Sequence, residues 1–366
     1  MNIPFFKFKS LLGLTVAPVV FFISLAHTNV LAYAGILAIP AVAILDLLLP
    51  RSLANPTKEQ EKIMESDHYY NVLVWLVAPT GFFCLIYFLV QINQRHSVES
   101  MFTLIGWTLS MALVGGIWGI AVGHELGHRT KAWEVYMGKM LLFISLRMTF
   151  MTFHNYGHHS HVGTPKDPTS SRRNEWSFIH VPKSLFLSWI EAWKIQRRIL
   201  KSKNINFFSP KNNVFWFTVI QWAAIIAVLL LADWQTALAF VCAGLTGSLL
   251  FELINYVEHY GLMRRKLSSG VYERVLPVHS WNDSHSITGS ILLNGMRHSD
   301  HHSTYSRPYQ LLRNYEEIPT NMPFNSAAMM LLALFPPLFF LIMNPKLDQI
   351  ELVRDEQESR SNYALS

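Results

Sequence analysis

Long apolar runs alternate with shorter polar connections along this sequence. The six longest runs approach the roughly 20 residues that an α-helix needs to cross about 30 Å of hydrocarbon. Charged residues make up only 15% of the chain, against about 25% in a soluble domain. We therefore expect an all-α polytopic membrane protein with a six-helix transmembrane bundle. Its spans are predicted at about residues 11–26, 30–49, 71–90, 102–122, 214–231 and 236–256.

Three features interrupt this pattern. Val135–Phe153 is nearly long enough to span, but Lys139 and Arg147 lie within it, and a crossing here would separate the histidines before it from those after it. We expect a buried or re-entrant helical pair instead. Residues 325–343 contain two consecutive prolines and are either a short seventh span or a helix packed against the bundle. Asp46 is interpreted as a polar residue at the end of the second span.

The basic residues predict the orientation of the chain. Two lysines precede the first span, so the positive-inside rule places the N-terminus in the cytoplasm. With six spans, segments 123–213 and 257–324 also face the cytoplasm, within one membrane-embedded domain of residues 1–366. The first segment is rich in Lys and Arg and contains a predicted amphipathic helix near Leu185–Leu200. Such a helix suits the membrane interface, and its basic face could dock an acidic electron carrier.

The net charge of +6 does not indicate a nucleic-acid partner. The basic residues lie between membrane segments and are not interleaved with aromatic residues that could stack on bases. A membrane surface is sufficient to explain them.

Nine of the sixteen histidines fall in four patches beside the predicted cytoplasmic helix ends. Spacings of three to five residues within a patch place the side chains on one helical face. Imidazole suits Zn, Cu, Fe and Ni, and nine such ligands exceed what one ion accepts, so two ions are the natural number. The patches are HELGH with His124 and His128, HNYGHH with His154, His158 and His159, NYVEHYG with His259, and RHSDHH with His298, His301 and His302.

Two other functions compete for these histidines. HELGH alone matches the H-E-x-x-H pattern of zinc metalloproteases, but a catalytic zinc site closes with three protein ligands and would leave the other histidines without a role. A metal transporter would need ligands along a transmembrane path, whereas these patches lie at one predicted end of the bundle. Zinc has no redox chemistry, so a pair of iron ions that act on O₂ is favoured.

Together the motifs resemble those of a known family. HELGHR, HNYGHH followed by HVGTPKDPTSSR, NYVEHYGL, HSWN and RHSDHH are similar to the histidine motifs of the integral-membrane alkane 1-monooxygenases. That family is related to the xylene and cymene methyl monooxygenases and to the membrane fatty acid desaturases. The resemblance implies a six-helix bundle around a non-haem di-iron centre. It also implies insertion of one atom of O₂ into a terminal C–H bond of a medium-chain alkane, which gives a primary alcohol.

The resemblance also implies roles for individual residues. Glu258 is the candidate catalytic carboxylate near the irons, while Glu125, Asp167 and Asp300 would accept hydrogen bonds from imidazole rings. The implied ligands of two Fe ions are His124, His128, His154, His158, His159, His259, His298, His301 and His302. How they divide between the two ions stays open. The other nearby histidines, His161, His279 and His285, are interpreted as structural or as supports for the ligands.

Partners and location follow from the same resemblance. We expect O₂, an apolar substrate from the bilayer, membrane lipid and a bacterial inner membrane with the histidines on the cytoplasmic side. The sequence has no C-x-x-C pair, and Cys84 and Cys242 lie in apolar runs. Electrons would therefore come from a separate donor, such as rubredoxin with its reductase or a ferredoxin-type reductase.

One position departs from the family pattern, and neighbouring activities stay open. Phe153 precedes His154, where the family commonly has Glu, and this puts the substrate preference in doubt. A membrane fatty-acyl desaturase or hydroxylase and an aromatic methyl-group hydroxylase are the alternatives. Their products differ in the carbon that is oxidised, and a desaturase incorporates no oxygen.

Overall fold

The computed structural model describes the backbone of residues 2–365 and the side chains of residues 2–356, and every extended regular element in this range is a helix. Six helical segments are long and apolar enough to cross a membrane, one at each predicted position. They are α1 (Ile3–Leu25), η1 with α2 (Val30–Tyr33 and Ala34–Leu48), α4 (His68–Arg95), α5 with η2 and α6 (Met101–Leu113, Val114–Val122 and Gly123–Gly127), α11 (Asn213–Leu231) and α12 (Trp234–His259). The all-α six-helix prediction is confirmed.

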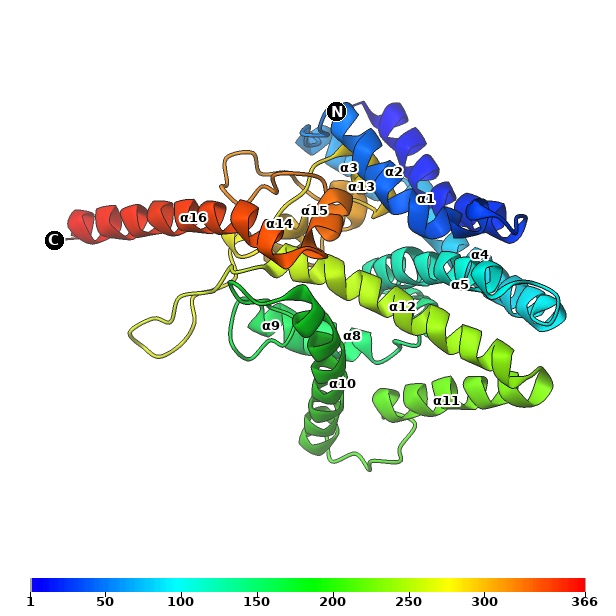
Figure 1. The fold of residues 1–366 in the computed structure, drawn as a ribbon. Coiled ribbons are helices and arrows are strands. Elements are labelled where there is room, and N and C mark those ends of the chain that lie inside the picture. The colour runs from blue at the N-terminus through cyan, green and yellow to red at the C-terminus, as the bar shows by residue number, and fades with distance from the viewer. Residues whose placement is uncertain (1, 366) are drawn as a thin grey trace.

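The bundle is built around α12, which runs through the centre of the molecule (Figure 1). This helix packs on α5, η2, α11, α10 (Ser177–Ser202) and α15 (Ser326–Ala333). The first helix, α1, packs against α2, α4 and α5. Large apolar side chains on the outer surface of these helices are exposed, for example Leu48 at 76% and Leu230 at 76%. Such exposure is expected where hydrocarbon rather than water surrounds a helix.

The segment between the first and second histidine patches forms a re-entrant pair, as predicted. Helix α7 (Ala132–Ile144) runs back along η2, the chain turns at residues 145–149, and α8 (Phe150–Phe153) returns to the end from which it came. Leu146 adopts a positive φ of 52° in this turn. The four histidine patches therefore stay at one end of the bundle.

Three glycines four residues apart explain how α7 lies so close to the neighbouring span. A Cβ atom on Gly115 would lie 2.7 Å from Ser145 Oγ, one on Gly119 would lie 3.0 Å from the Leu141 carbonyl, and one on Gly123 would lie 2.9 Å from the Gly138 carbonyl. Small residues at this spacing let two helix backbones approach each other within a membrane.

The amphipathic helix predicted in the basic segment is present and longer than expected. Helix α10 (Ser177–Ser202) crosses the histidine end of the bundle at a steep angle to α12 (Figure 1). Helix α10 contacts α12 through the buried Glu252, which accepts a hydrogen bond from Ser184 of α10. Glu252 also forms an ion pair with Arg147.

The shorter elements close the histidine end. They are α3 (Lys58–Ser66), η3 (His154–His158), α9 (His159–His161), η4 (Pro277–His279), α13 (Ser286–Ile291), α14 (His298–Ser303) and η5 (Tyr309–Leu311). Residues 325–343 divide between α15 (Ser326–Ala333), which packs on α2 and α12, and α16 (Pro336–Leu365), which extends away from the bundle (Figure 1). Within the described residues neither is among the candidate spans, and the packing of α15 on α2 and α12 agrees with the packed-helix alternative.

Asp46 has a larger role than the sequence indicated. Its side chain is fully buried, and its two carboxylate oxygens accept hydrogen bonds from the backbone N–H groups of Ile287 and Thr288, at 2.7 and 2.8 Å. It thereby caps the first turn of α13 from α2. This contact fixes the loop before the last histidine patch against the bundle.

Candidate metal centre

The nine clustered histidines converge into two groups. The five-histidine group contains His124, His128, His154, His159 and His301. The four-histidine group contains His158, His259, His298 and His302. Within each group, one ring nitrogen from every residue lies within 4.8 Å of the others.

A π-helical turn decides how HNYGHH is divided. The backbone N–H of His159 donates to the carbonyl of His154, five residues back. His154 and His159 therefore project to one side with their Nε2 atoms 2.9 Å apart, and His158 points to the other group. An α-helical turn would instead have aligned His154 with His158, four residues on.

The other two multi-histidine patches use ordinary α-helical spacing. His124 and His128 are four residues apart and join the five-histidine group, and His298 and His302, also four apart, join the other. His301, three residues after His298, crosses to the five-histidine group, where its Nε2 lies 3.0 Å from that of His124. Helix α14 thus contributes to both groups.

The spacing of the ring nitrogens fits a bound cation. Neighbouring Nε2 atoms lie 2.8 Å apart for His124 and His154, 3.1 Å for His259 and His298, and 3.2 Å for His158 and His302. A metal–nitrogen bond of about 2.1 Å gives about 3.0 Å between ligands at right angles. Two neutral rings could share a hydrogen bond at such a distance, but four or five converging nitrogens cannot all be paired in this way, whereas a cation accepts the lone pair of each.

The protonation of these rings also fits a metal site. Burial lowers the pKa of His128 to about 4 and that of His298 to about 3. Burial, aided by neighbouring histidines, likewise lowers the pKa of His154, His159, His301 and His302. The rings are therefore neutral near pH 7, which is the form of imidazole that binds a metal.

The polar run after HNYGHH holds His158 in place. His158 Nδ1 lies 2.9 Å from Asp167 Oδ2 and 2.7 Å from Thr169 Oγ1, and Ser170 donates to the same carboxylate. Hydrogen bonds of this kind fix the orientation and tautomer of a ligand imidazole. The predicted role of Asp167 is thus seen in the geometry, and Thr169 adds a partner that the sequence did not single out.

The other two acidic residues expected to support imidazole rings have different partners. Glu125 accepts hydrogen bonds from Arg129 and from the backbone N–H of Tyr309. Asp300 accepts from Arg307 and from the Tyr315 hydroxyl. The contacts of both carboxylates therefore join segments of the chain near the histidine groups, and neither carboxylate orients a ligand ring.

Glu258 faces the cavity between the histidines. Its Oε1 atom lies 3.3 Å from His298 Nδ1, and it lines a cavity together with His124, His154 and His301. The HSWN motif fixes this part of the chain, because the backbone N–H of Trp281 donates to the Glu258 carbonyl and its indole N–H donates to the Tyr260 carbonyl, both at 2.8 Å. The side chain is thus held beside both groups.

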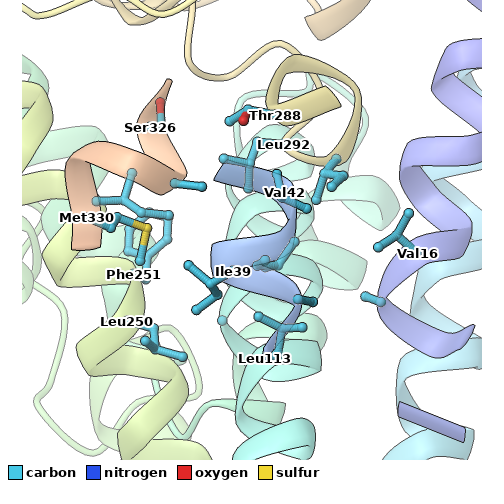
Figure 2. Close-up of a pocket in the computed structure, with 17 residues that line it drawn as sticks. Val16, Ile39, Val42, Leu113, Leu250, Phe251, Thr288, Leu292, Ser326 and Met330 are labelled. Carbon is cyan, nitrogen blue, oxygen red and sulfur yellow. The ribbon is translucent and has the colours of Figure 1, made fainter. Parts of the chain in front are cut away.

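An apolar slot within the bundle adjoins this cavity. Side chains from α1, α2, α5, α12, α13 and α15 surround it, among them Val16, Ile39, Leu113 and Met330 (Figure 2). Its lining has two hydroxyl-bearing residues, Thr288 and Ser326, and no charged residue. Phe251, Ile254 and Leu292 line both the slot and the cavity at the histidines. These residues could not be selected from the sequence alone, since apolar stripes usually pack as core.

The remaining histidines near the patches lie outside the two groups. His279 contacts Glu273 at 3.0 Å and His285 contacts Asp283 at 2.6 Å, and both rings are buried. His161 and Phe153 line a groove on the outer surface of the histidine end. Phe153 therefore lies behind the ligand helix, away from the apolar slot.

Comparison with known proteins agrees with this geometry. A model of the fatty acid desaturase family matches residues 100–333. Alkane 1-monooxygenase 2 of Alcanivorax borkumensis is 36% identical over 308 residues, which cover 84% of this chain and 80% of the relative. Alkane 1-monooxygenase 1 of Pseudomonas aeruginosa is 33% identical over 91% of this chain and 89% of its own length. The xylene/toluene monooxygenase hydroxylase component XylM of Pseudomonas putida is 27% identical over 86% of this chain and 82% of its own length.

Proposed function

This chain belongs to the fatty acid desaturase family and, within it, to the alkane 1-monooxygenases, and on that premise we propose that it hydroxylates the terminal carbon of a medium-chain alkane. The reaction is RCH₃ + O₂ + 2 e⁻ + 2 H⁺ → RCH₂OH + H₂O. The observation that carries this proposal is the uncharged apolar slot that shares Phe251, Ile254 and Leu292 with the cavity lined by the grouped histidines.

We assign the nine grouped histidines as ligands of two iron ions, five at one ion and four at the other. Iron supplies the redox chemistry with O₂ that neither imidazole nor a carboxylate can perform. The protein positions the substrate and keeps the site dry. Phe251, Ile254 and Leu292 narrow the end of the slot, so that an extended chain would present its terminal carbon to the histidine cavity.

Glu258 is assigned as the catalytic carboxylate. Its Oε1 atom lies 3.3 Å from His298 Nδ1, whose hydrogen-bond partner is the Gly295 carbonyl, so the carboxylate can take up or release a proton beside the histidines. Glu258→Gln keeps the size of the side chain but cannot release a proton. We expect it to bind iron as the unchanged protein does and to lose most of its turnover. Loss of iron together with turnover would instead indicate that Glu258 is needed for metal binding.

The lining of the slot favours an alkane over a fatty-acyl substrate. An acyl thioester or carboxylate needs polar or charged partners for its head group, because a buried polar group without hydrogen bonds is costly. The slot offers only the hydroxyls of Thr288 and Ser326. Hydroxylation of a methyl group is therefore favoured over desaturation of an acyl chain.

We propose that a separate acidic carrier of the rubredoxin or ferredoxin type supplies the electrons at a basic stripe on α10. The stripe consists of Lys194, Arg197, Arg198 and Lys201, spaced for one helical face, and all four side chains are exposed. It borders the outer groove, whose floor includes Gly157, the residue before His158. This surface would face the cytoplasm in an inner membrane, in agreement with the positive-inside rule.

The decisive experiment measures metal content and products on detergent-purified protein. With a supplied reductant and ¹⁸O₂, a medium-chain alkane should give a primary alcohol that contains the label, and the protein should bind two irons per chain. His68→Ala is the matched control for alanine variants of the grouped histidines, because His68 is exposed and lies outside both groups. An alkene without label would favour the desaturase, and a single zinc with proteolysis would favour the protease.

A further inference from the structure

A second cavity near the centre shares no lining residue with the apolar slot. This interfacial groove runs between α10 and α12, beside the turn that joins α7 to α8. Leu185, Phe186 and Leu245 form an apolar part, and Arg147, Ser188 and Ser248 form a polar part. The groove is therefore amphipathic, whereas the slot is almost wholly apolar.

One side chain separates the groove from the histidine cavity. Phe150 lines both of them. Its ring stacks on His154 with centroids 5.0 Å apart and meets the ring of Phe251 edge-on at 5.5 Å. Aromatic rings can turn about χ1 and χ2 without any change in the backbone, and Phe150 is the one residue that the linings of the two cavities share.

Arg147 gives the groove a specific chemistry. It is 5% exposed and pairs with Glu252, and its Nη2 atom also donates to Ser188 Oγ at 3.3 Å. Its Nη1 atom has no hydrogen-bond partner although it is buried. The ion pair leaves no net charge, so the unused N–H donor suits a neutral oxygen acceptor such as a hydroxyl better than an anion.

We propose that the interfacial groove binds the primary alcohol as it leaves the centre, with Phe150 as the gate. The inference rests on the proposed function, since the alcohol is the product of that reaction. The hydroxyl would accept a hydrogen bond from Arg147 Nη1, and the alkyl chain would lie along Leu185 and Phe186. Substrate and product then use different routes: the apolar slot admits the alkane, and the amphipathic groove releases a molecule that has gained a polar end.

Photolabelling tests the binding site directly. The probe is a medium-chain primary alcohol with a mid-chain diazirine, used under argon and without reductant, so that the result does not depend on turnover. We expect cross-links within residues 182–189, competed by unlabelled alcohol but not by alkane. Cross-links confined to α2, α13 or α15 would overturn the proposal. Equal labelling by a carboxylate probe of the same length would also overturn it, because the groove would then be a general site for lipid-like amphiphiles.

Kinetics test the release route. Leu245→Trp would fill the groove from its exposed side, and Leu238→Trp is the matched control, since both leucines are about half exposed on α12 and only Leu245 lines the groove. We expect Leu245→Trp to lower steady-state turnover several-fold while the alcohol yield of a single turnover stays unchanged. Retained alcohol would be oxidised again, RCH₂OH + O₂ + 2 e⁻ + 2 H⁺ → RCHO + 2 H₂O, so the aldehyde fraction should rise.

The outcomes separate the two proposals. If Leu245→Trp and Leu238→Trp give the same turnover and the same aldehyde fraction, the groove is not the release route. Failure of the proposed function would appear elsewhere, as an absence of labelled alcohol from alkane in the unchanged protein.

Discussion

The two histidine groups differ in how they are supported. The four rings of the four-histidine group are at most 6% exposed, and hydrogen bonds hold the second nitrogen of His158 and His298. In the five-histidine group, His124, His128 and His159 are partly exposed, and Tyr305, itself 57% exposed, lies against His128 and His159. One group therefore has more ligands and the other has more support around its ligands.

This difference has a chemical consequence. Five imidazoles nearly fill the positions around a six-coordinate ion, whereas four leave room for two more groups. The four-histidine group also has Glu258 beside it, and Gly157, which precedes its ligand His158, lines the outer groove. We infer that it depends on every one of its ligands, and that the five-histidine group tolerates the loss of one better.

Removal of a single ligand should give the largest contrast. His259→Ala leaves three ligands in its group, and His128→Ala leaves four in the other. We expect His259→Ala to lose about one iron per chain and to lower turnover by more than the roughly 10–100-fold typical of losing an outer hydrogen-bond partner. His128→Ala should lose less of both. Equal loss in the two variants, measured by metal analysis and alcohol formation, would remove the distinction between the groups.

Removal of a supporting hydrogen bond is the next test. Asp167→Asn keeps the shape of the side chain but weakens the contact with His158 Nδ1, and we expect iron affinity at one site to fall by about 10–100-fold. Glu125→Gln is the comparison variant, because Glu125 pairs with Arg129 and with the Tyr309 backbone. Competition with a chelator measures the iron affinity of both variants. A larger fall in iron affinity for Glu125→Gln than for Asp167→Asn would contradict the assignment of Asp167, and not Glu125, as the support of a ligand ring.

The basic stripe should produce a smaller and salt-dependent effect. We expect Arg197→Glu with Arg198→Glu to raise the KM for an acidic protein donor by about tenfold at low salt, and the effect should shrink as salt screens the charges. Lys203→Glu with Lys211→Glu is the matched control, since these exposed lysines belong to the same segment but do not line the outer groove.

A chemical reductant distinguishes the role of the stripe. Turnover with a small neutral electron mediator should be the same in both double variants and in the unchanged protein. If turnover with the neutral mediator instead depends on anionic lipid, and depends on it less in the Arg197→Glu, Arg198→Glu variant, the stripe binds the membrane.

The smallest expected effect is on the stability of protein stripped of metal. The pKa values of His128 and His298 fall to about 4 and about 3 in the folded chain, mainly through burial, against about 6.5 when unfolded. The unfolded chain then binds more protons below pH 6.5, so the stability of the folded state is fully present above that pH and is lost as the pH falls toward 4 and 3. Thermal unfolding followed from pH 7.5 to 5 should show a falling midpoint, with a weaker dependence in His128→Gln. A midpoint that rises as the pH falls would contradict burial of neutral rings.

Much of the molecule could be predicted from the sequence, for identifiable reasons. The six spans followed from run length and composition, because hydrocarbon admits only long apolar helices. The interruptions at Lys139 and Arg147 excluded a further crossing, and the structure has a re-entrant pair there. The nine histidines that converge were all singled out by their motifs.

The partition of those histidines required the tertiary structure. Spacing alone assumes a regular helix, but the π-turn at His154 moves His158 away from its neighbour, and His301 crosses from α14 to the other group. Asp46, Phe251 and Arg147 acquire their roles only through partners far along the chain. The sequence therefore determined which segments enter the membrane and which side chains can hold metal, since both depend on local composition. Which side chains face one another depends on how the helices pack, and only the tertiary structure decided it.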